Sequence, residues 1–423
     1  MQDFLIELVK NAGADAWEIT DVENYGWEFY FIKHKLDQNR VKKTEHTSVK
    51  LFKKSEDGKF LGSAVSEIAP TASREEAQAI LGKLLFQASL VKNPVYTLNE
   101  KKETEAEAAE FDVSKIAGNF IKAMQELPET ETEYINSYEI FVNGEKRRFL
   151  NSNGIDVTAA YPSSMIEVVV NAKNEDHEIE LYRMYTSGAC DAEALKEKLG
   201  RTLTEGRDRL TTKKTPALGT ATIALTTDAA LEVYQYFANR MSCGYKYQGL
   251  SDYEIGEPVI KDAEGDALTV TARAFLPNSS GNCPFDPEGA PVRDLTIIKD
   301  TRAEHFWGSR QFASYLGVSD SFIAGNFEVA GGEKTSSELL SGDFLEIVEF
   351  SDFQVDAMTG SIAGEIRLGY LHRGGEVMIV SGGSVSGNMH EAGRGLHFSK
   401  ETVQYDNYII PAVTILTLTV TGA

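Results

Sequence analysis

The stretch SGNMHEAGRGLH, residues 386–397, contains a histidine–glutamate pair, His390 and Glu391, and a second histidine, His397. A zinc hydrolase could use such residues, because two histidines bind the metal and a glutamate activates a metal-bound water. That arrangement needs the two histidines one helical turn apart, whereas these lie seven residues apart, which is about 10 Å along a helix. Two intervening glycines also disfavour a helix. We interpret the stretch as a loop or strand end, opened by a turn at residues 386–388.

Two other groups of polar residues are weaker candidates for a site. His305 lies in the aromatic sequence HFW, and a histidine in such surroundings is more often packed than part of a groove. Asp286 and Glu288 lie in the sequence FDPEG, which is typical of a turn held by carboxylate caps. A catalytic carboxylate pair has no further support there. The sequence also lacks a G-x-S-x-G nucleophile motif, a P-loop and a dinucleotide-binding fingerprint.

The composition limits the class of protein. A chain of 423 residues with 42% hydrophobic and 25% charged residues is typical of a globular protein with two or more domains. The formal net charge of −22 disfavours general binding to nucleic acids and to anionic membranes. The cysteines are odd in number and widely spaced, which favours a reducing compartment; they are Cys190, Cys243 and Cys283.

Neither end of the sequence has the pattern of a targeting or membrane segment. The first thirteen residues carry acidic side chains inside their apolar pattern, unlike a signal peptide. The late apolar run at 409–420 is shorter than the ~20 residues of a membrane span. We therefore expect a cytoplasmic protein with no membrane partner.

Apolar periodicity predicts the elements that would position the candidate residues. In the first half we expect a capped helix from Ser73, an acidic linker at about 98–112, and a helix with Asp112 as its N-cap. Asn143-Gly144 and Asn153-Gly154 are predicted to be hairpin turns. The other expected elements are a helix at 4–9, strands at 27–34, 47–54, 60–68, 165–172 and 178–187, and a charged helix at 191–209.

The second half of the chain reads differently. A strand at 220–226 precedes a helix that opens at Thr227 and Asp228, and strands with glycine-containing turns follow from about residue 250. We predict an α+β fold with two domains. Residues 1–215 would form an N-terminal α/β domain with helices packed on a sheet. Residues 216–423 would form a β-rich C-terminal domain with a large, mostly antiparallel curved sheet.

Several motifs, in their order and spacing, resemble those of the TldD/PmbA family, also called TldD/TldE. They are GKFLGSAVSE at 58–67, NSNGIDVTAAYPSSMIEVVV at 151–170, FDPEGAPVRDLTIIKD at 285–300, FQVDAMTGSIAGEIRLGYLHRGGEVMIVSGGSVSGN at 353–388 and IIPAVTILTLTVTG at 409–422. The resemblance spans nearly the whole chain. It implies a cytoplasmic protein related to metalloproteases, in a family that carries the older label "modulator of DNA gyrase".

The family has two kinds of subunit, and the resemblance implies which kind this is. One kind binds zinc through H-E-x-x-x-H on a helix near the start of the C-terminal domain, together with a late cysteine; the other kind lacks the motif and pairs with the first. The matching helix here carries Gln235, Tyr236 and Arg240 at those positions, and no cysteine follows Cys283. An amide is a poor zinc ligand, a phenol is no general base, and a guanidinium repels the metal. The resemblance therefore implies a zinc-less chain, with zinc expected in a TldD-like partner.

Two hypotheses for function remain, and a third is less favoured. In the first, the chain is the zinc-less, TldE/PmbA-like subunit of a metalloprotease heterodimer that processes peptides or unfolded polypeptides, which would add as a strand to a sheet edge. Such a chain would be inactive alone, so its status as an enzyme stays open. In the second, it is a non-catalytic homodimer that binds peptides or proteins. In the third, it is an independent hydrolase that uses His390 and Glu391. Groove candidates are His305, Asp286, Glu288, Asn388 and His390.

The interval 33–54 is locally basic, with eight Lys and Arg residues against Asp37 and Glu45. A basic interval of this kind is the one local argument for a nucleic-acid contact. A solvated sheet face is the favoured interpretation on so acidic a chain. A third interpretation, intermediate between these two, is a patch that contacts an acidic surface of another protein.

Overall fold

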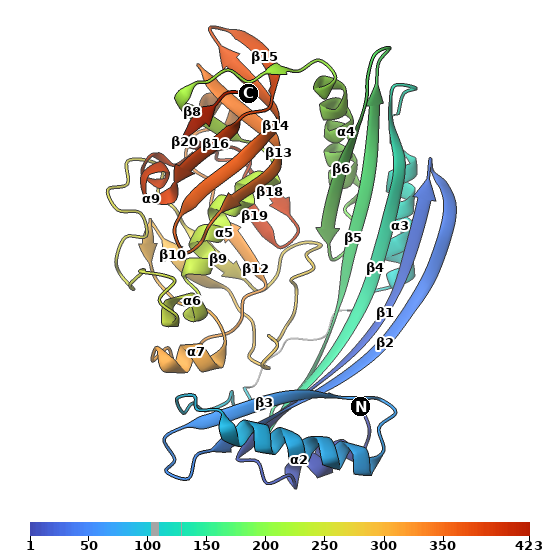
Figure 1. The fold of residues 1–423 in the computed structure, drawn as a ribbon, viewed down its shortest axis with the longest axis vertical. Helices are drawn as coiled ribbons and strands as arrows, with labels where there is room; N and C mark the ends of the chain where they lie inside the picture. Colours follow the sequence, from blue (N-terminus) through green and yellow to red (C-terminus); the bar gives the residue numbers. More distant parts are fainter. Residues whose placement is uncertain (103–109, 128) are drawn as a thin grey trace.

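The N-terminal region is one long, curved, antiparallel sheet (Figure 1). The computed structural model describes residues 1–102, 110–127 and 129–423. The strands are β1 (Ala16–Ile32), β2 (Lys35–Lys54), β3 (Leu61–Ile68), β4 (Glu133–Asn151), β5 (Asp156–Lys173) and β6 (Glu178–Ser187). Their spatial order is β3–β2–β1–β4–β5–β6. β2 alone has 20 residues, about 65 Å of extended chain, so the strands are much longer than the runs predicted from apolar pattern.

One predicted hairpin turn is wrong. Asn143 and Gly144 lie within β4, opposite Gly26 and Tyr25 of β1, and continue the strand pairing. The glycine there serves packing: a Cβ atom on Gly144 would lie 2.6 Å from the ring of Phe111. The other prediction is confirmed, since the turn between β4 and β5 contains Gly154 with φ of +88°.

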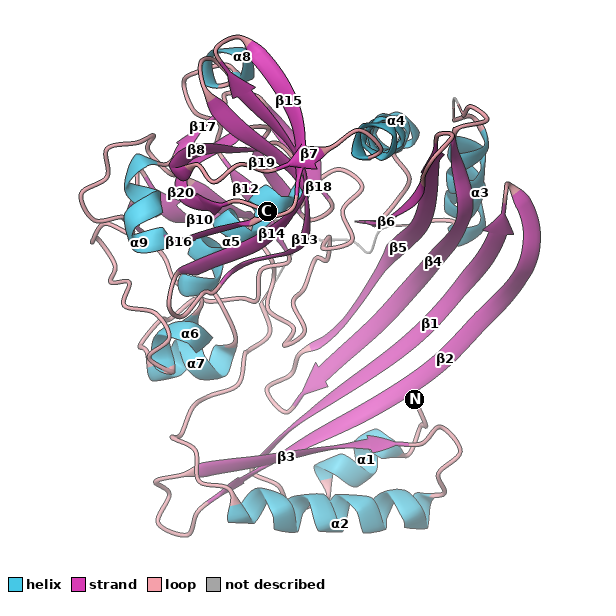
Figure 2. Ribbon diagram, turned by 45° about the horizontal axis from the view of Figure 1, so that its top comes forward, coloured by secondary structure: helices cyan, strands magenta, loops and turns pink. Residues whose placement is uncertain are grey.

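Among the described residues, four helices pack on this sheet: α1 (Leu5–Lys10), α2 (Arg74–Leu90), α3 (Val113–Gln125) and α4 (Ala192–Arg209). The predicted caps are confirmed. Ser73 and Glu76 form a reciprocal capping box at the start of α2, and the Asp112 side chain accepts hydrogen bonds from the first amides of α3. α1 and α2 cover one end of the sheet, whereas α3 and α4 cover the face at the other end (Figure 2).

Replacing Asp112 with alanine should lower the free energy of unfolding by about 1 kcal/mol. The carboxylate accepts hydrogen bonds from the amides of Ser114 and Lys115 at 2.9 and 3.1 Å, and alanine leaves both without that partner. Urea unfolding of Asp112→Ala measures the loss. Glu110→Ala, at an exposed position two residues earlier, is the matched control, and an equal loss in the control would refute the capping role.

The predicted linker at 98–112 is described only in part. Its start packs on the C-terminal domain: Asn99 Nδ2 donates to the carbonyl of Glu288 at 3.2 Å, and Lys102 pairs with Asp320. This start is therefore not free in solvent. Residues 103–109 lie outside the described part of the chain.

The C-terminal domain contains the large, mostly antiparallel sheet expected and a second, smaller sheet. One has strands β7 (Lys213–Lys214), β8 (Gly219–Leu225), β13 (Phe344–Val355), β14 (Ser361–Arg373), β15 (Glu376–Ser381), β16 (Ser384–Asn388) and β20 (Thr414–Thr421), with β17 (His397–Phe398) paired to β20. The other has β9 (Val270–Arg273), β10 (Leu295–Lys299), β11 (Arg302–Ala303), β12 (Asn326–Val329), β18 (Thr402–Tyr405) and β19 (Tyr408–Pro411). β20 lies inside its sheet, between β8 and β16.

Short helices complete the domain, and one of them lies in its core. They are η1 (Asp228–Ala230), α5 (Leu231–Arg240), α6 (Cys243–Tyr247), α7 (Arg310–Tyr315), α8 (Ser336–Leu339), α9 (Met389–Ala392) and η2 (Gly393–Gly395). One apolar cluster joins both sheets to α5, with buried members that include Ile223, Phe237, Val270, Ile297, Ile366 and Leu416. Burial of this cluster fixes the position of α5.

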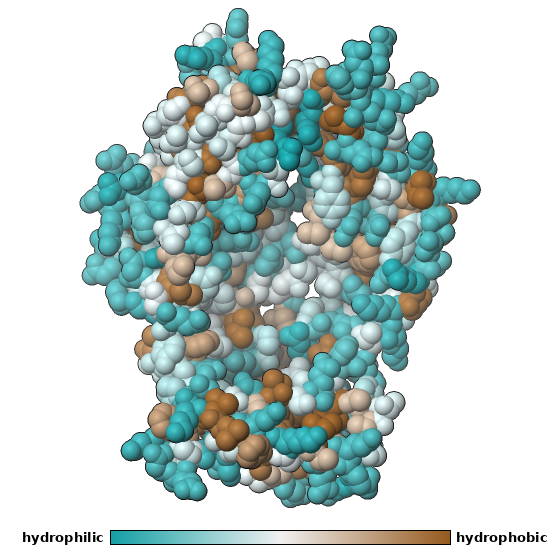
Figure 3. Space-filling model, viewed as in Figure 1, coloured by the Kyte–Doolittle hydropathy of each residue, from teal (hydrophilic) through white to brown (hydrophobic). Residues whose placement is uncertain are grey.

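The α+β class is confirmed, and the sheets are mostly antiparallel. The division at residues 215 and 216 remains a prediction from sequence; α4 ends at Arg209, and β7 pairs with β15. Arg183 of β6 pairs with Glu205 of α4 and, across the two regions, with Glu349 of β13, at 3.1 Å each. Elsewhere the surface between them is hollowed (Figure 3). No helix in the described ranges is long and apolar enough to cross a membrane.

Candidate functional site

The strongest candidate site surrounds the C-terminal end of α5. This helix follows β8 through η1, and its buried side makes it part of the core between the two sheets. Tyr236 and Arg240, one turn apart, are 3% and 2% exposed. A buried arginine requires compensating partners, since an isolated charge is costly in a low-dielectric interior.

Arg240 has those partners. Its Nη1 donates to the carbonyl oxygens of Ala357 at 2.8 Å and Met358 at 3.3 Å, and to that of Leu250 at 3.3 Å. Its Nη2 forms an ion pair with Asp252. Burial alone would raise the pKa of Asp252, but the charge and hydrogen bond of Arg240 outweigh it, and the pKa of Asp252 is lowered.

Two aromatic rings flank the same guanidinium. The centre of the guanidinium lies 5.2 Å from the ring centroid of Tyr236 and 4.7 Å from that of Tyr253, within the range of cation–π attraction. Burial raises the pKa of both phenols, so they stay neutral at physiological pH. Arg240 is therefore a fixed positive charge enclosed by rings, carbonyl oxygens and one carboxylate.

Two of the three carbonyls bound by Arg240, those of Ala357 and Met358, belong to a tight turn at residues 356–360. The Asp356 carboxylate accepts hydrogen bonds from the amides of Met358 and Thr359 at 3.1 and 2.6 Å. Gly360 has φ of +73°, a conformation that favours glycine. With the bonds from Arg240, nearly every peptide group of the turn has a partner. These bonds hold the backbone of the turn, which carries the exposed Met358 side chain.

Asn388 and His390 lie against this turn. Asn388 Nδ2 donates to the carbonyl of Thr359 at 3.0 Å, and the amide of Met389 donates to that of Gly360 at 2.7 Å. A Cβ atom on Gly360 would lie 3.4 Å from the Tyr236 hydroxyl and 3.5 Å from His390 Cδ2. The structure therefore brings two of the predicted groove residues to the end of α5, although they lie about 150 positions later in the chain.

The interpretation of residues 386–397 needs correction. Residues 386–388 end strand β16 and do not form a turn, and Asn388 caps the short helix α9 that holds His390 and Glu391. His397 lies in β17, where its Nδ1 is 3.4 Å from Asp266. His390 is exposed, and no group of three or more potential metal ligands occurs among the described residues.

The residues at the end of α5 do not fit a zinc ion. Gln235 is partly exposed, Tyr236 is a neutral phenol, and the Arg240 guanidinium already occupies the carbonyl oxygens of the turn. A metal cation next to this guanidinium would meet a like charge that cannot be deprotonated. We derive no metal-dependent step from this centre.

Asp286 and Glu288 lie elsewhere, at the junction with the N-terminal sheet. Asp286 accepts hydrogen bonds from the amides of Glu288 and Ala290, at 2.9 Å each, and from that of Ile323 at 2.8 Å. It therefore holds the turn and has no free oxygen aimed at a substrate. Burial raises its pKa, and the three amides oppose that effect.

Glu288 is the unusual member of the pair. Its carboxylate accepts the amide of Arg310 at 2.6 Å but has no ion pair with a described residue. Burial, together with the nearby Asp286 and Glu18, raises the pKa of Glu288 to about 7, although the Arg310 amide and Lys50 oppose this. Glu288 thus titrates near neutral pH at a domain junction.

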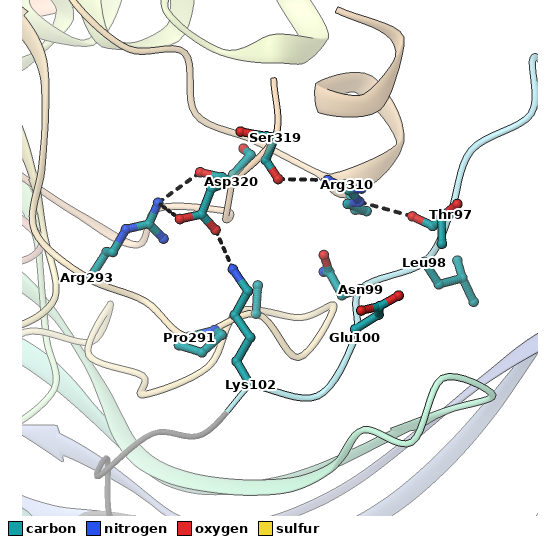
Figure 4. A pocket seen from close by; sticks show the side chains of 12 residues that line it. Thr97, Leu98, Asn99, Glu100, Lys102, Pro291, Arg293, Arg310, Ser319 and Asp320 are labelled. Carbon is teal, nitrogen blue, oxygen red and sulfur yellow. Dashed lines mark hydrogen bonds and ion pairs between the residues drawn. The ribbon is translucent and has the colours of Figure 1, made fainter. Parts of the chain in front are cut away.

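His305 does not belong to either cluster. Its side chain is exposed, contrary to the packed position expected, and Nδ1 lies 3.0 Å from the carbonyl oxygen of Thr296. A separate pocket of about 230 Å³ lies between the domains, where residues 97–102 meet C-terminal loops (Figure 4). Arg293 and Arg310 line it, and both are bonded to Asp320, Ser319 or Thr97. The bonds from Arg310 to Thr97 and from Lys102 to Asp320 hold the two regions together at this pocket.

Sequence reasoning missed Asp252 and Tyr253, which complete the surroundings of Arg240. The available signal was chemical: an arginine inside a largely apolar helical pattern needs a carboxylate and acceptors, and SDYE at 251–254 is the first acidic segment that follows it in the sequence.

Comparison with known proteins agrees with this architecture. Residues 218–422 match the family described as PmbA/TldA metallopeptidase C-terminal domain. Three crystal structures are similar over nearly their whole length: a candidate modulator of a DNA gyrase from Thermotoga maritima (17% identity, TM-score 0.78, covering 100% of this chain and 99% of that one), TldE from Thermococcus kodakarensis (15%, 0.77, 98% and 98%), and a candidate modulator of DNA gyrase from Bacteroides thetaiotaomicron (15%, 0.78, 99% and 98%). No curated protein matches the sequence.

Proposed function

We propose that this chain, whose residues 218–422 match the PmbA/TldA metallopeptidase C-terminal domain family, is a zinc-less, TldE/PmbA-like subunit of a metalloprotease system that processes peptides or unfolded polypeptides. In this proposal the metal and the activated water belong to a TldD-like partner. The present chain supplies shape: a wall of the groove and a surface on which the partner assembles.

The observation that carries the proposal is the state of Arg240. A buried guanidinium, bonded to two carbonyls of the 356–360 turn and enclosed by two tyrosine rings, stands where the resemblance implies a metal ligand. Metal-assisted hydrolysis needs a bound ion and a general base near it, and this helix end supplies neither. Its contacts instead stabilise the loops that face the surface.

The proposal predicts a sharp difference between the chain alone and the assembled pair. The purified chain should cleave no unfolded peptide, and elemental analysis should find no stoichiometric zinc in it. Cleavage should arise on mixing with a TldD-like subunit and should be lost with chelator. The assay compares each subunit alone with the mixture, using the same peptide.

Three results would count against the proposal. Chelator-resistant cleavage by the lone chain would contradict the metal-dependent assignment. About one zinc per chain, lost in His390→Ala, would revive the independent hydrolase. A partner equally active without this chain would leave the homodimeric binding protein as the better account, which sedimentation of the isolated chain would then test.

A further inference from the structure

We propose that the outer half of β2, residues 35–46, binds an acidic, extended segment of a partner protein, which adds as a further strand to the sheet. This docking edge, as we call residues 35–46, is separate from the α5 site. The inference goes beyond the proposed function and does not depend on a metal in any subunit.

The backbone of the docking edge is free on one side. β2 pairs with β1 over residues 35–52 but with β3 only over residues 47–54. No backbone hydrogen bond joins residues 35–46 to any described residue outside β1. β2 forms the outer margin of the sheet, away from the C-terminal domain (Figures 1 and 2). Alternate N–H and C=O groups therefore point into solvent over twelve residues.

The edge lacks most of the devices that protect such margins. Natural edge strands are commonly short, contain proline, or are interrupted by bulges. The docking edge contains no proline. Its one irregularity in pairing with β1 lies near the turn, where Asp37 is an extra residue between the pairs Tyr30–Gln38 and Phe31–Leu36. Lysines are the remaining protection, and they are present here together with exposed apolar side chains.

The exposure of these apolar side chains indicates that a partner covers them. Leu36 and Val41 are 47% and 50% exposed, and Ile32 and Tyr25 on the paired strand are 54% and 43% exposed. Leu36 lies opposite Phe31 and Val41 opposite Trp27, so both continue an aromatic row on one face of the sheet. An added strand with apolar residues on that face would cover them.

The charge of the edge selects the partner. Lys35, Lys42 and Lys43 are exposed and form no ion pair with a described residue, whereas Arg40 is paired with Glu28. These free cations are concentrated on a protein whose net charge is −22. Carboxylates on an incoming strand would meet them at cross-strand distances, where opposite charges attract.

Two other partners fit less well. A second copy of this chain, paired edge to edge across a two-fold axis, would place the same lysine-rich strand against itself, and like charges opposite one another are unfavourable. A nucleic acid would use the cations but neither the free backbone groups nor Leu36 and Val41. An acidic, partly apolar strand uses all three features.

Fluorescence anisotropy with the full chain tests the proposal. The probe is a labelled peptide of about ten residues, the length of a long strand, in which glutamate and valine alternate. Three comparison probes are the matching lysine–valine peptide, the glutamate–valine peptide with N-methyl groups at alternate residues, and a DNA duplex of similar length. The test variant is Lys35→Glu/Lys42→Glu/Lys43→Glu. The control, Lys83→Glu/Lys261→Glu/Lys299→Glu, changes the net charge equally at exposed positions elsewhere.

We expect the glutamate–valine peptide to bind the natural chain and the control variant equally well. Its binding to the test variant should be at least about tenfold weaker. The N-methylated peptide should likewise bind the natural chain at least about tenfold more weakly than the unmodified peptide does. Equal binding of the N-methylated peptide would refute strand addition. Binding of DNA in place of the peptide, lost in the test variant, would reassign the edge to nucleic acid. Binding of no probe would show that the lysines only protect the edge.

Discussion

Replacing Arg240 with methionine is expected to lower the free energy of unfolding by about 3 kcal/mol, because removal of one partner from a buried charge network leaves the others uncompensated. The carbonyls of Ala357 and Met358 would lose their donor. Methionine retains much of the apolar stem volume, so the loss reports mainly the guanidinium. Arg240→Lys should recover only part of it, since an ammonium cannot reproduce the planar fork of donors.

Urea unfolding and amide hydrogen exchange measure this effect together. We expect faster exchange at residues 356–360 in Arg240→Met, because the turn loses its support. Arg394→Met, at a position whose side chain is 51% exposed, is the matched control and should change stability by less than about 0.5 kcal/mol. A loss in Arg240→Met no greater than in the control would refute the central role of Arg240.

Stability should also fall as pH rises from about 4.3 to about 7, because of Glu288. Its folded-state pKa, about 7, exceeds the value of about 4.3 expected in the unfolded chain. The folded state therefore binds more protons between these values, and the stabilising contribution is complete below the lower pKa and lost as pH passes the higher one. Glu288→Gln stays neutral and retains an acceptor for the Arg310 amide.

The difference in unfolding free energy between Glu288→Gln and the natural chain should therefore shift in favour of the variant by about 2 kcal/mol between pH 5 and pH 8.5. Urea unfolding at several pH values measures it. Glu56→Gln, at an exposed position, should show no such shift. A difference that does not change with pH would show that Glu288 is not the titrating group.

Local signals predicted the helices well and the strands less well. Ser73, Asp112 and Asp191 each cap a helix where a side chain can reach nearby amides, which is a short-range property. The length of β2 was underestimated because residues 35–46 have almost no buried side chains and so no alternating pattern. The turn at Lys33 and His34, with φ of 46° and 61°, has no glycine to mark it.

The candidate site was predicted in pieces. Arg240 and Asn388 are each predicted from a separate motif, and the turn at 356–360 lies within the motif at 353–388 without being predicted as a turn. Their meeting depends on the packing of α5 between two sheets, which involves residues more than 100 positions apart. Asp252, the ion-pair partner of Arg240, lies in an irregular segment where sequence pattern carries little information.

The interior position of β20 has a consequence for folding during synthesis. Residues 414–421 pair with β8 and with β16, so each of these strands has a partner on one side only, β13 and β14 respectively, until β20 is available. During synthesis β8 and β16 precede β20, so each has one open edge, and part of the apolar core is exposed, until β20 has been made. Non-local pairing of this kind slows folding, and unpaired edges invite association with other chains. The nascent chain thus has a prolonged period in which chaperone contact is of greatest value.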